Sequence, residues 1–127
     1  MATTAAIAIC VILVGAGVFQ ALLAAGKPWG EWAFGGQMKG TLPTAYRIAS
    51  LVSISIYAAQ IGHYLAQADL IASPFSASTA TVTNWVLVGF FALGTLMNGI
   101  SRSKKERALW TPILAVSLLL SIAVALG

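Results

Sequence analysis

Four long apolar runs divide the chain, and each is close to the length that a helix needs to cross a bilayer. About 20 predominantly apolar residues span the hydrocarbon as an α-helix. The pattern predicts membrane-spanning helices over residues 5–25, 43–71, 84–100 and 110–126. The runs lack the apolar and polar alternation of barrel strands, and only helices or closed barrels satisfy their backbone in lipid. The spans are therefore predicted to be helical.

Composition places these runs in lipid rather than in the core of a soluble protein. Of the 127 residues, 59% are hydrophobic and 8% are charged, whereas soluble domains carry about a quarter charged residues. A chain of this length leaves much of its surface exposed, so a soluble fold has no place for so many apolar side chains. We predict an all-α fold, in which residues 1–127 form one integral membrane four-helix bundle with short connecting loops.

Basic residues gather in two of the three predicted connections. They are Lys27, Lys39 and Arg47 at the first, and Arg102, Lys104, Lys105 and Arg107 at the third. Both connections lie on the same side of a four-helix chain, and the opposite side carries only Asp69. The positive-inside rule places the basic loops in the cytoplasm. We expect a multi-pass protein of the cell inner membrane with both termini outside.

Rows of small residues predict where the helices touch. Lipid gives helices no hydrophobic reason to associate, so small residues that permit close backbone approach mark contact faces. The rows are Gly17, Ala21 and Ala25; Ala58, Gly62 and Ala66; Gly89 and Gly94; and Ser117, Ser121 and Ala125. They predict a tight bundle with little internal volume, in which Gly17, Gly62 and Gly94 contact neighbouring helices.

A polar seam follows the second predicted helix. It consists of Tyr46, Ser50, Ser53, Tyr57, Gln60, Tyr64 and Gln67, spaced by three and four residues. Such a seam should face protein or water rather than lipid. His63 lies at its edge and is the only histidine, and ionisable groups inside membranes are candidates for function. Tyr57, Gln60 and His63 are therefore candidate ligand-binding residues, with plain interhelical hydrogen bonding as the alternative.

Further polar residues fall near the predicted cytoplasmic side. Gln20, Arg47 and Asn98 lie at similar depth by helical rise, and Glu31 is the only acid in the first connection. An unpaired arginine in hydrocarbon costs at least about 3 kcal/mol. We expect Arg47 to point inward and to pair with Glu31, Asn98 or an anionic group such as a lipid phosphate. The alternative is that it extends outward to the headgroups.

The first connection, residues 26–40, is too apolar for an ordinary solvated loop. It contains two tryptophans, a phenylalanine and five glycines. Tryptophan favours the membrane interface, so we expect this loop to lie on or dip into the headgroup layer. Its glycines lack the spacing of a nucleotide-binding loop, and a lipid-phosphate site there is a hypothesis.

Short motifs of the chain resemble a loose group of small, functionally uncharacterised four-helix bacterial membrane proteins. The motifs are Pro28-Trp29-Gly30, Gly35-Gly36, Gly40-x-Leu42-Pro43, Arg47, Asn98, Ser101, Glu106-Arg107 and Trp110-x-Pro112. The resemblance implies a bacterial inner-membrane setting and no catalytic role. The chain lacks the first-helix glutamate of small multidrug exporters and the Gly and Asn patterns of fluoride channels.

The sequence contains no recognisable catalytic set. Paired carboxylates inside the membrane, a second histidine and a metal-ligand spacing for Cys10 are all missing, and catalysis usually needs two convergent ionisable groups. We expect no cofactor, no metal and no nucleic acid. The expected partners are membrane lipids, a second copy of the chain or a partner membrane protein. The favoured function is binding of a lipid or partner at the cytoplasmic face, and the alternatives are a small transporter or channel subunit using the polar seam, or an enzyme centred on His63.

Overall fold

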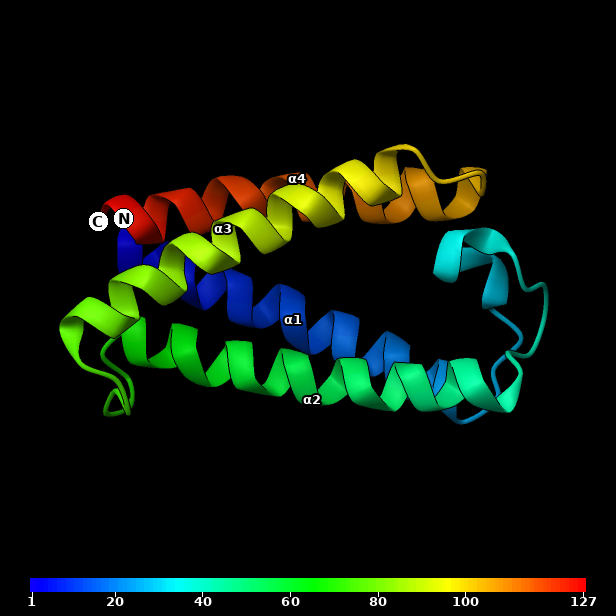
Figure 1. The fold of residues 1–127 in the computed structure, drawn as a ribbon, viewed down its shortest axis with the longest axis horizontal. Helices are drawn as coiled ribbons and strands as arrows, with labels where there is room; N and C mark the ends of the chain where they lie inside the picture. The colour runs from blue at the N-terminus through cyan, green and yellow to red at the C-terminus, as the bar shows by residue number, and fades with distance from the viewer.

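The computed structural model describes residues 1–127 as four long helices with short connections (Figure 1). They are α1 (Ala2–Ala24), α2 (Thr44–Gln67), α3 (Ala77–Gly99) and α4 (Lys104–Leu126). Two short 3-10 turns, η1 (Gly30–Trp32) and η2 (Phe34–Gly36), lie in the first connection. All four helices are long and apolar enough to cross a membrane. The predicted all-helical membrane bundle is confirmed.

The two ends of the bundle differ in charge. The end with the first and third connections carries every Lys and Arg of the chain, and we call it the basic end (Figure 1, right). The terminal end holds both chain termini and the connection between α2 and α3 (Figure 1, left). As predicted from the alternation of the spans, the two basic connections lie together.

The helices pack in an order that differs from their order along the chain. α1 packs against both α2 and α4, and α4 also packs against α3. α2 and α3 are consecutive in sequence, but they approach each other at the terminal end and diverge toward the basic end (Figure 1). The side of the bundle between α2 and α3 is therefore its least closed side.

The third and fourth helices begin earlier than predicted. α3 starts at Ala77, seven residues before the predicted start at residue 84. The Ser76 hydroxyl accepts a hydrogen bond from the Thr79 N–H (3.3 Å), and the hydroxyls of Thr81 and Thr83 donate to carbonyls one turn earlier. A capping serine and threonines bonded to their own helix allow a polar segment to be helical.

α4 starts at Lys104 rather than at residue 110. The hydroxyl of Ser103 accepts a hydrogen bond from the Glu106 N–H (3.2 Å), which satisfies one of the free amides at the helix start. α2 in turn ends at Gln67, four residues before the predicted end, and Asp69 follows it in the left-handed region (φ 59°). Hydropathy alone misplaced these boundaries because capping, not polarity, sets them.

Most of the buried apolar core lies in the half of the bundle near the terminal end. Its largest members are Ile9, Leu13, Tyr64 and Phe91. A smaller cluster, formed by Leu23, Ala33 and Leu42, lies at the basic end and joins the first connection to the helices. The bundle is thus filled at its terminal end and sealed by the connecting loop at its basic end.

The small-residue rows predicted only part of the packing. A Cβ at Gly94 would touch the side chain of Leu114 on α4 at 3.4 Å, so this contact is confirmed. The predictions for Gly17 and Gly62 were wrong, because a Cβ at either position would meet nothing within 4 Å. Ser117 and Ser121 of α4 are buried. Four-residue spacing defines a helix face but not whether a neighbour lies against it.

A chain of three polar side chains joins α2 to α3 near the terminal end. Asn84 on α3 donates from Nδ2 to Oε1 of Gln67 (2.9 Å), so its Oδ1 faces Nε2 of His63 at 2.7 Å. Asn84 accepts there, and His63 therefore carries its proton on Nε2. His63 and Asn84 are both buried. These bonds hold α2 and α3 together at the terminal end, where the two helices approach each other.

Replacing Asn84 with alanine should destabilise the bundle. The substitution leaves His63 and Gln67 without their partner in an apolar environment, and we expect a loss of about 1–2 kcal/mol. Asn98→Ala is the matched control, because Asn98 donates only to Gly94 of its own helix. Unfolding in detergent, followed by helical circular dichroism, measures both variants. Equal stabilities for the two variants would contradict the assignment of His63, Asn84 and Gln67 as an interhelical clamp.

Candidate functional site: a cavity near the basic end

A cavity of about 240 Å³ lies inside the bundle and extends toward the basic end. α1, α3 and α4 supply most of its wall, residues 32–34 close it at the basic end, and α2 contributes Tyr57 alone. Its aromatic lining consists of Phe19, Trp32, Phe34, Tyr57, Phe90, Phe91 and Trp110. The prediction of little internal volume was therefore wrong. The rows of small residues on the four helices do not meet one another at the depth of this cavity.

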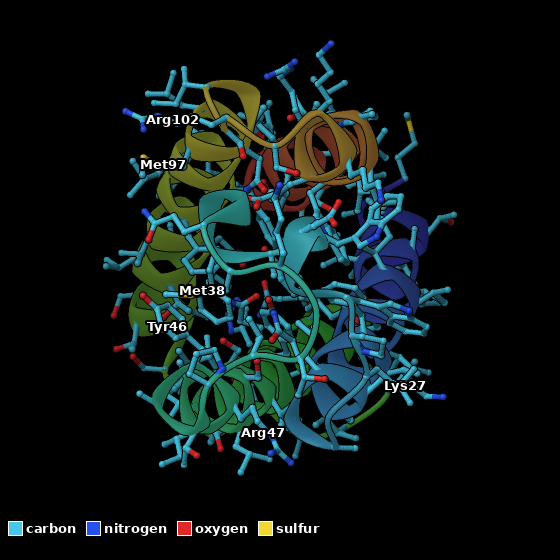
Figure 2. All side chains as sticks on the ribbon, turned by 90° about the vertical axis from the view of Figure 1, so that its right-hand side faces the viewer. Lys27, Met38, Tyr46, Arg47, Met97 and Arg102 are labelled. Atoms are coloured by element: carbon cyan, nitrogen blue, oxygen red, sulfur yellow. The ribbon has the colours of Figure 1, made fainter.

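The cavity opens between α2 and α3. Phe90 of α3 lines it and is also 41% exposed on the outer surface. α2 diverges from α3 toward the basic end (Figure 1), and Tyr57 is the only residue of α2 that lines the cavity. Seen from the basic end, Met38 and Tyr46 lie in the same sector, between α2 and α3 (Figure 2). This side of the cavity faces lipid when the helices span a membrane.

The first connection closes the cavity by docking on the start of α4. We call residues 30–36 the docked segment. The Trp110 indole N–H donates to the carbonyl oxygen of Trp32 (2.8 Å), and the Ser103 hydroxyl donates to that of Glu31 (2.5 Å). A Cβ on Gly36 would overlap Ser103, so only glycine permits this approach. On the other side, the ring of Phe34 packs edge-on against Tyr46 of α2, with centroids 5.2 Å apart.

Glu106 is the one carboxyl group in the cavity wall. Its side chain is 7% exposed, and its Oε2 atom has no hydrogen-bond partner. A glutamate three residues after a capping serine commonly bonds back to the serine N–H. Here that N–H donates instead to the Ser101 hydroxyl (3.2 Å), which leaves the carboxyl group free to face the cavity. The backbone N–H groups of Gly35 and Gly36 lie close to it.

Three of the predicted site residues meet around this cavity. Gln20, Tyr57 and Asn98 all line it. The side chain of Gln20 lies against the Tyr57 hydroxyl, and its Oε1 atom is buried without a partner. Asn98 donates to the Gly94 carbonyl of its own helix (2.8 Å). The sequence-based grouping by depth thus placed Gln20 and Asn98 correctly at one level.

The predicted pairing of Arg47 with Glu31 or Asn98 was wrong. Its Nε donates to the Ala24 carbonyl at the end of α1 (2.9 Å), and Arg47 does not line the cavity. The last carbonyls of a helix lack partners within the helix and carry partial negative charge, and they provide the acceptor that the prediction sought in a carboxylate. Glu31 is paired with Lys105 instead (3.0 Å). Both of these side chains are substantially exposed, so their ion pair adds little stability.

The other two candidates, Gln60 and His63, lie outside the cavity wall. Both are buried. His63 belongs to the interhelical clamp, and the Oε1 atom of Gln60 has no hydrogen-bond partner. The polar seam of α2 does face the interior, since Ser50, Gln60 and Tyr64 are buried, but only its Tyr57 reaches the cavity.

A second hollow, of about 300 Å³, lies at the surface of the basic end and is lined only by polar residues and glycines. Its lining is Glu31, Gly35, Gly36, Lys39, Arg102, Ser103, Lys104 and Lys105. The docked segment separates it from the cavity. Figure 2 shows Arg102 on the α3 side of this end, away from Lys27 and Arg47. Four of the seven basic residues thus line one hollow, whereas Lys27 and Arg47 lie elsewhere on this end.

The sequence analysis missed Glu106 and Trp110 as site residues. Glu106 was placed in the third connection and Trp110 at the first residue of the fourth helix, because the charged stretch before residue 110 hid the helix start. The signal was present in the pattern Ser103-x-x-Glu106, which is typical of a helix N-terminus. With the helix begun there, Glu106, Trp110, Ile113 and Ser117 fall on one face, and all four line the cavity.

Comparison with protein-family models, with curated proteins and with solved structures finds no match for this chain. The structure contains no group of three or more His, Cys, Asp or Glu side chains that could hold a metal ion.

Gly36→Ala should weaken the docking of the segment more than Gly35→Ala. Both glycines have positive φ, 70° and 71°, so each substitution carries a backbone cost of about 1–2 kcal/mol. Only at position 36 does the added methyl group overlap Ser103, whereas at position 35 the nearest atom is 4.0 Å away. We expect an additional loss of about 1–3 kcal/mol for Gly36→Ala. Thermal unfolding of both variants tests this, and equal midpoints would show that the segment is not held against Ser103.

Proposed function

We propose that this protein binds an amphiphilic small molecule that enters from the membrane through the opening between α2 and α3. The observation that carries the proposal is the largely apolar cavity whose buried polar atoms, Oε2 of Glu106 and Oε1 of Gln20, have no partner. Small-molecule sites are typically apolar hollows with a few placed polar groups. The apolar part of the ligand would contact the aromatic wall, and its polar part would contact these atoms.

Transport along the α2 seam is less well supported by the geometry. Of the seam residues only Tyr57 lines the cavity. Toward the terminal end the interior is occupied by packed core residues, among them Ile9, Tyr64 and Phe91. A binding site needs one accessible hollow, whereas a transport path has to continue to the other side. The arrangement therefore favours binding.

We further propose that the basic end faces the cytoplasm of a bacterial cell and that both termini lie outside its inner membrane. The positive-inside rule supports this orientation, because all seven Lys and Arg residues lie at one end. Anionic headgroups of the inner leaflet would lie near the polar hollow lined by Lys39, Arg102 and Lys104.

Filling the cavity should abolish ligand binding. In Ala16→Phe the new ring enters the cavity from the middle of α1, whereas in Val18→Phe it points outward, since Val18 is 55% exposed. Both variants add an aromatic ring to the same helix. Native mass spectrometry of protein released from membranes should show a bound small molecule on the wild type and on Val18→Phe, and none on Ala16→Phe. A wild type that carries no more bound mass than Ala16→Phe would contradict the proposal.

The orientation is tested by accessibility of engineered cysteines. Lys39→Cys and Lys104→Cys should be shielded from a membrane-impermeant thiol reagent in intact cells, and Asp69→Cys should react. Cys10 is buried and can be replaced with alanine to remove background labelling. Labelling of positions 39 and 104 in intact cells, with position 69 protected, would reverse the proposed orientation.

A further inference from the structure

We infer that the ligand of the cavity is a lipophilic cation, with an ammonium group placed beside Glu106 and Trp110. The inference rests on the proposed function and specifies the chemical class of its ligand. It follows from the charge of the cavity wall, from the kind of polar atoms left unpartnered and from the aromatic residues around them.

The cavity wall carries charged side chains of one sign only. Glu106 is its only acidic residue, and the wall contains no Lys, Arg or His. The basic residues beside Glu106 in sequence do not neutralise it. Lys105 pairs with Glu31 (3.0 Å), and Arg107 donates to the Ser101 carbonyl (2.7 Å). Buried charges are normally paired, so Glu106 lacks a counter-ion that a cationic ligand would supply.

The unpartnered atoms both accept hydrogen bonds. Oε2 of Glu106 and Oε1 of Gln20 have no hydrogen-bond partner, and both residues line the cavity. The N–H groups of Gly35 and Gly36 lie near the carboxyl group of Glu106, and the hydroxyl of Tyr57 lies near Gln20, but neither satisfies these two atoms. An ammonium group carries several N–H donors and a positive charge, so it suits both atoms. A carboxylate or phosphate would place acceptor against acceptor, and a hydroxyl would supply a single donor without charge.

Aromatic rings flank the carboxyl group. Trp110 follows Glu106 by one helical turn, and its ring packs edge-on against Phe19 with centroids 5.0 Å apart. Trp32 lies on the docked segment, held by the bond from the Trp110 indole, and its ring already carries the ammonium group of Lys105, 5.6 Å from the ring centroid. The faces of such rings attract cations, and a desolvated site strengthens this attraction. A carboxyl group beside several aromatic rings is a suitable setting for an ammonium ion.

The route into the site is also compatible with this charge. Direct approach from the basic end would bring a cation past Lys39, Lys104 and Lys105, which line the polar hollow beyond the docked segment. The opening between α2 and α3 avoids that barrier, because no Lys, Arg or His lines the cavity. An amphiphile dissolved in the bilayer meets an apolar entrance first and the carboxyl group at the inner end of its path.

Three probes with the same ten-carbon chain test the inference: decylammonium, decanol and decanoate. Each is titrated calorimetrically into lipid nanodiscs that hold the wild-type protein, and nanodiscs with Ala16→Phe provide the partition background to subtract. We expect decylammonium to bind at least about tenfold more tightly than decanol. Decanoate should show no binding above background.

Glu106→Gln should remove the preference for decylammonium over decanol without changing the shape of the cavity. Decylammonium should then bind about as weakly as decanol, while decanol itself is unchanged. Glu106→Asp keeps the charge on a shorter side chain and should keep the order of the probes, which separates loss of charge from misfolding. The melting temperature of each variant in nanodiscs completes the comparison.

The outcomes separate the two proposals. If none of the three probes binds above the Ala16→Phe background and no molecule co-purifies with the protein, the proposed function itself fails. If decanol or decanoate binds as tightly as decylammonium, or if Glu106→Gln leaves the preference intact, the cavity is a binding site but the inferred cation specificity is wrong.

Discussion

The docking of residues 30–36 on the start of α4 is the interaction on which the site depends. The Ser103 hydroxyl takes part twice, accepting from the Glu106 N–H to begin the helix and donating to the Glu31 carbonyl to hold the segment. The indole of Trp110, two turns along α4, holds the Trp32 carbonyl. These bonds close the cavity at the basic end and bury Glu106. Without the segment, the same carboxyl group would lie at an exposed helix start and would have no special chemistry.

The opening of the cavity follows from how the helices are held together. Lipid supplies no hydrophobic force between helices, so close packing and polar bonds decide which of them meet. α1 is packed on both sides, whereas α2 and α3 are joined by the bonds of Asn84 to His63 and Gln67 at the terminal end. Away from that clamp the two helices separate. The bonds of Asn84 hold α2 and α3 together at the terminal end, and the docked segment lies between the helices at the basic end. The side between α2 and α3 is therefore the side on which the proposed ligand would enter from the membrane.

The polar groups of the protein divide into two kinds. The side-chain N–H groups of Arg47, Asn84 and Trp110 each satisfy an acceptor on another element, and these bonds are structural. Six buried side-chain oxygen atoms have no hydrogen-bond partner, and of these only the atoms of Glu106 and Gln20 belong to residues that line the cavity. Because an unmade hydrogen bond in an apolar setting costs free energy, these atoms are the places where a ligand can contribute most. The proposed cation would supply hydrogen-bond donors and a positive charge to these oxygen atoms.

The sequence by itself determined the four helical spans, the common end of the basic residues and the inward face of the α2 seam, because each follows from local hydropathy or helical period. It also grouped Gln20 with Asn98, since depth along a spanning helix follows from residue count. Only the tertiary structure decided which helices are neighbours. The neighbouring helices in turn decided which groups bond to the polar side chains and which side chains pack against the glycines. Arg47 found the carbonyl of Ala24 rather than Glu31 because the end of α1 lies beside the start of α2. Gly94 meets Leu114 while Gly17 and Gly62 meet nothing, because α4 lies against α3 and no helix covers the other two faces. Periodicity defines the face of a helix, but what covers that face depends on contacts between segments far apart in the chain.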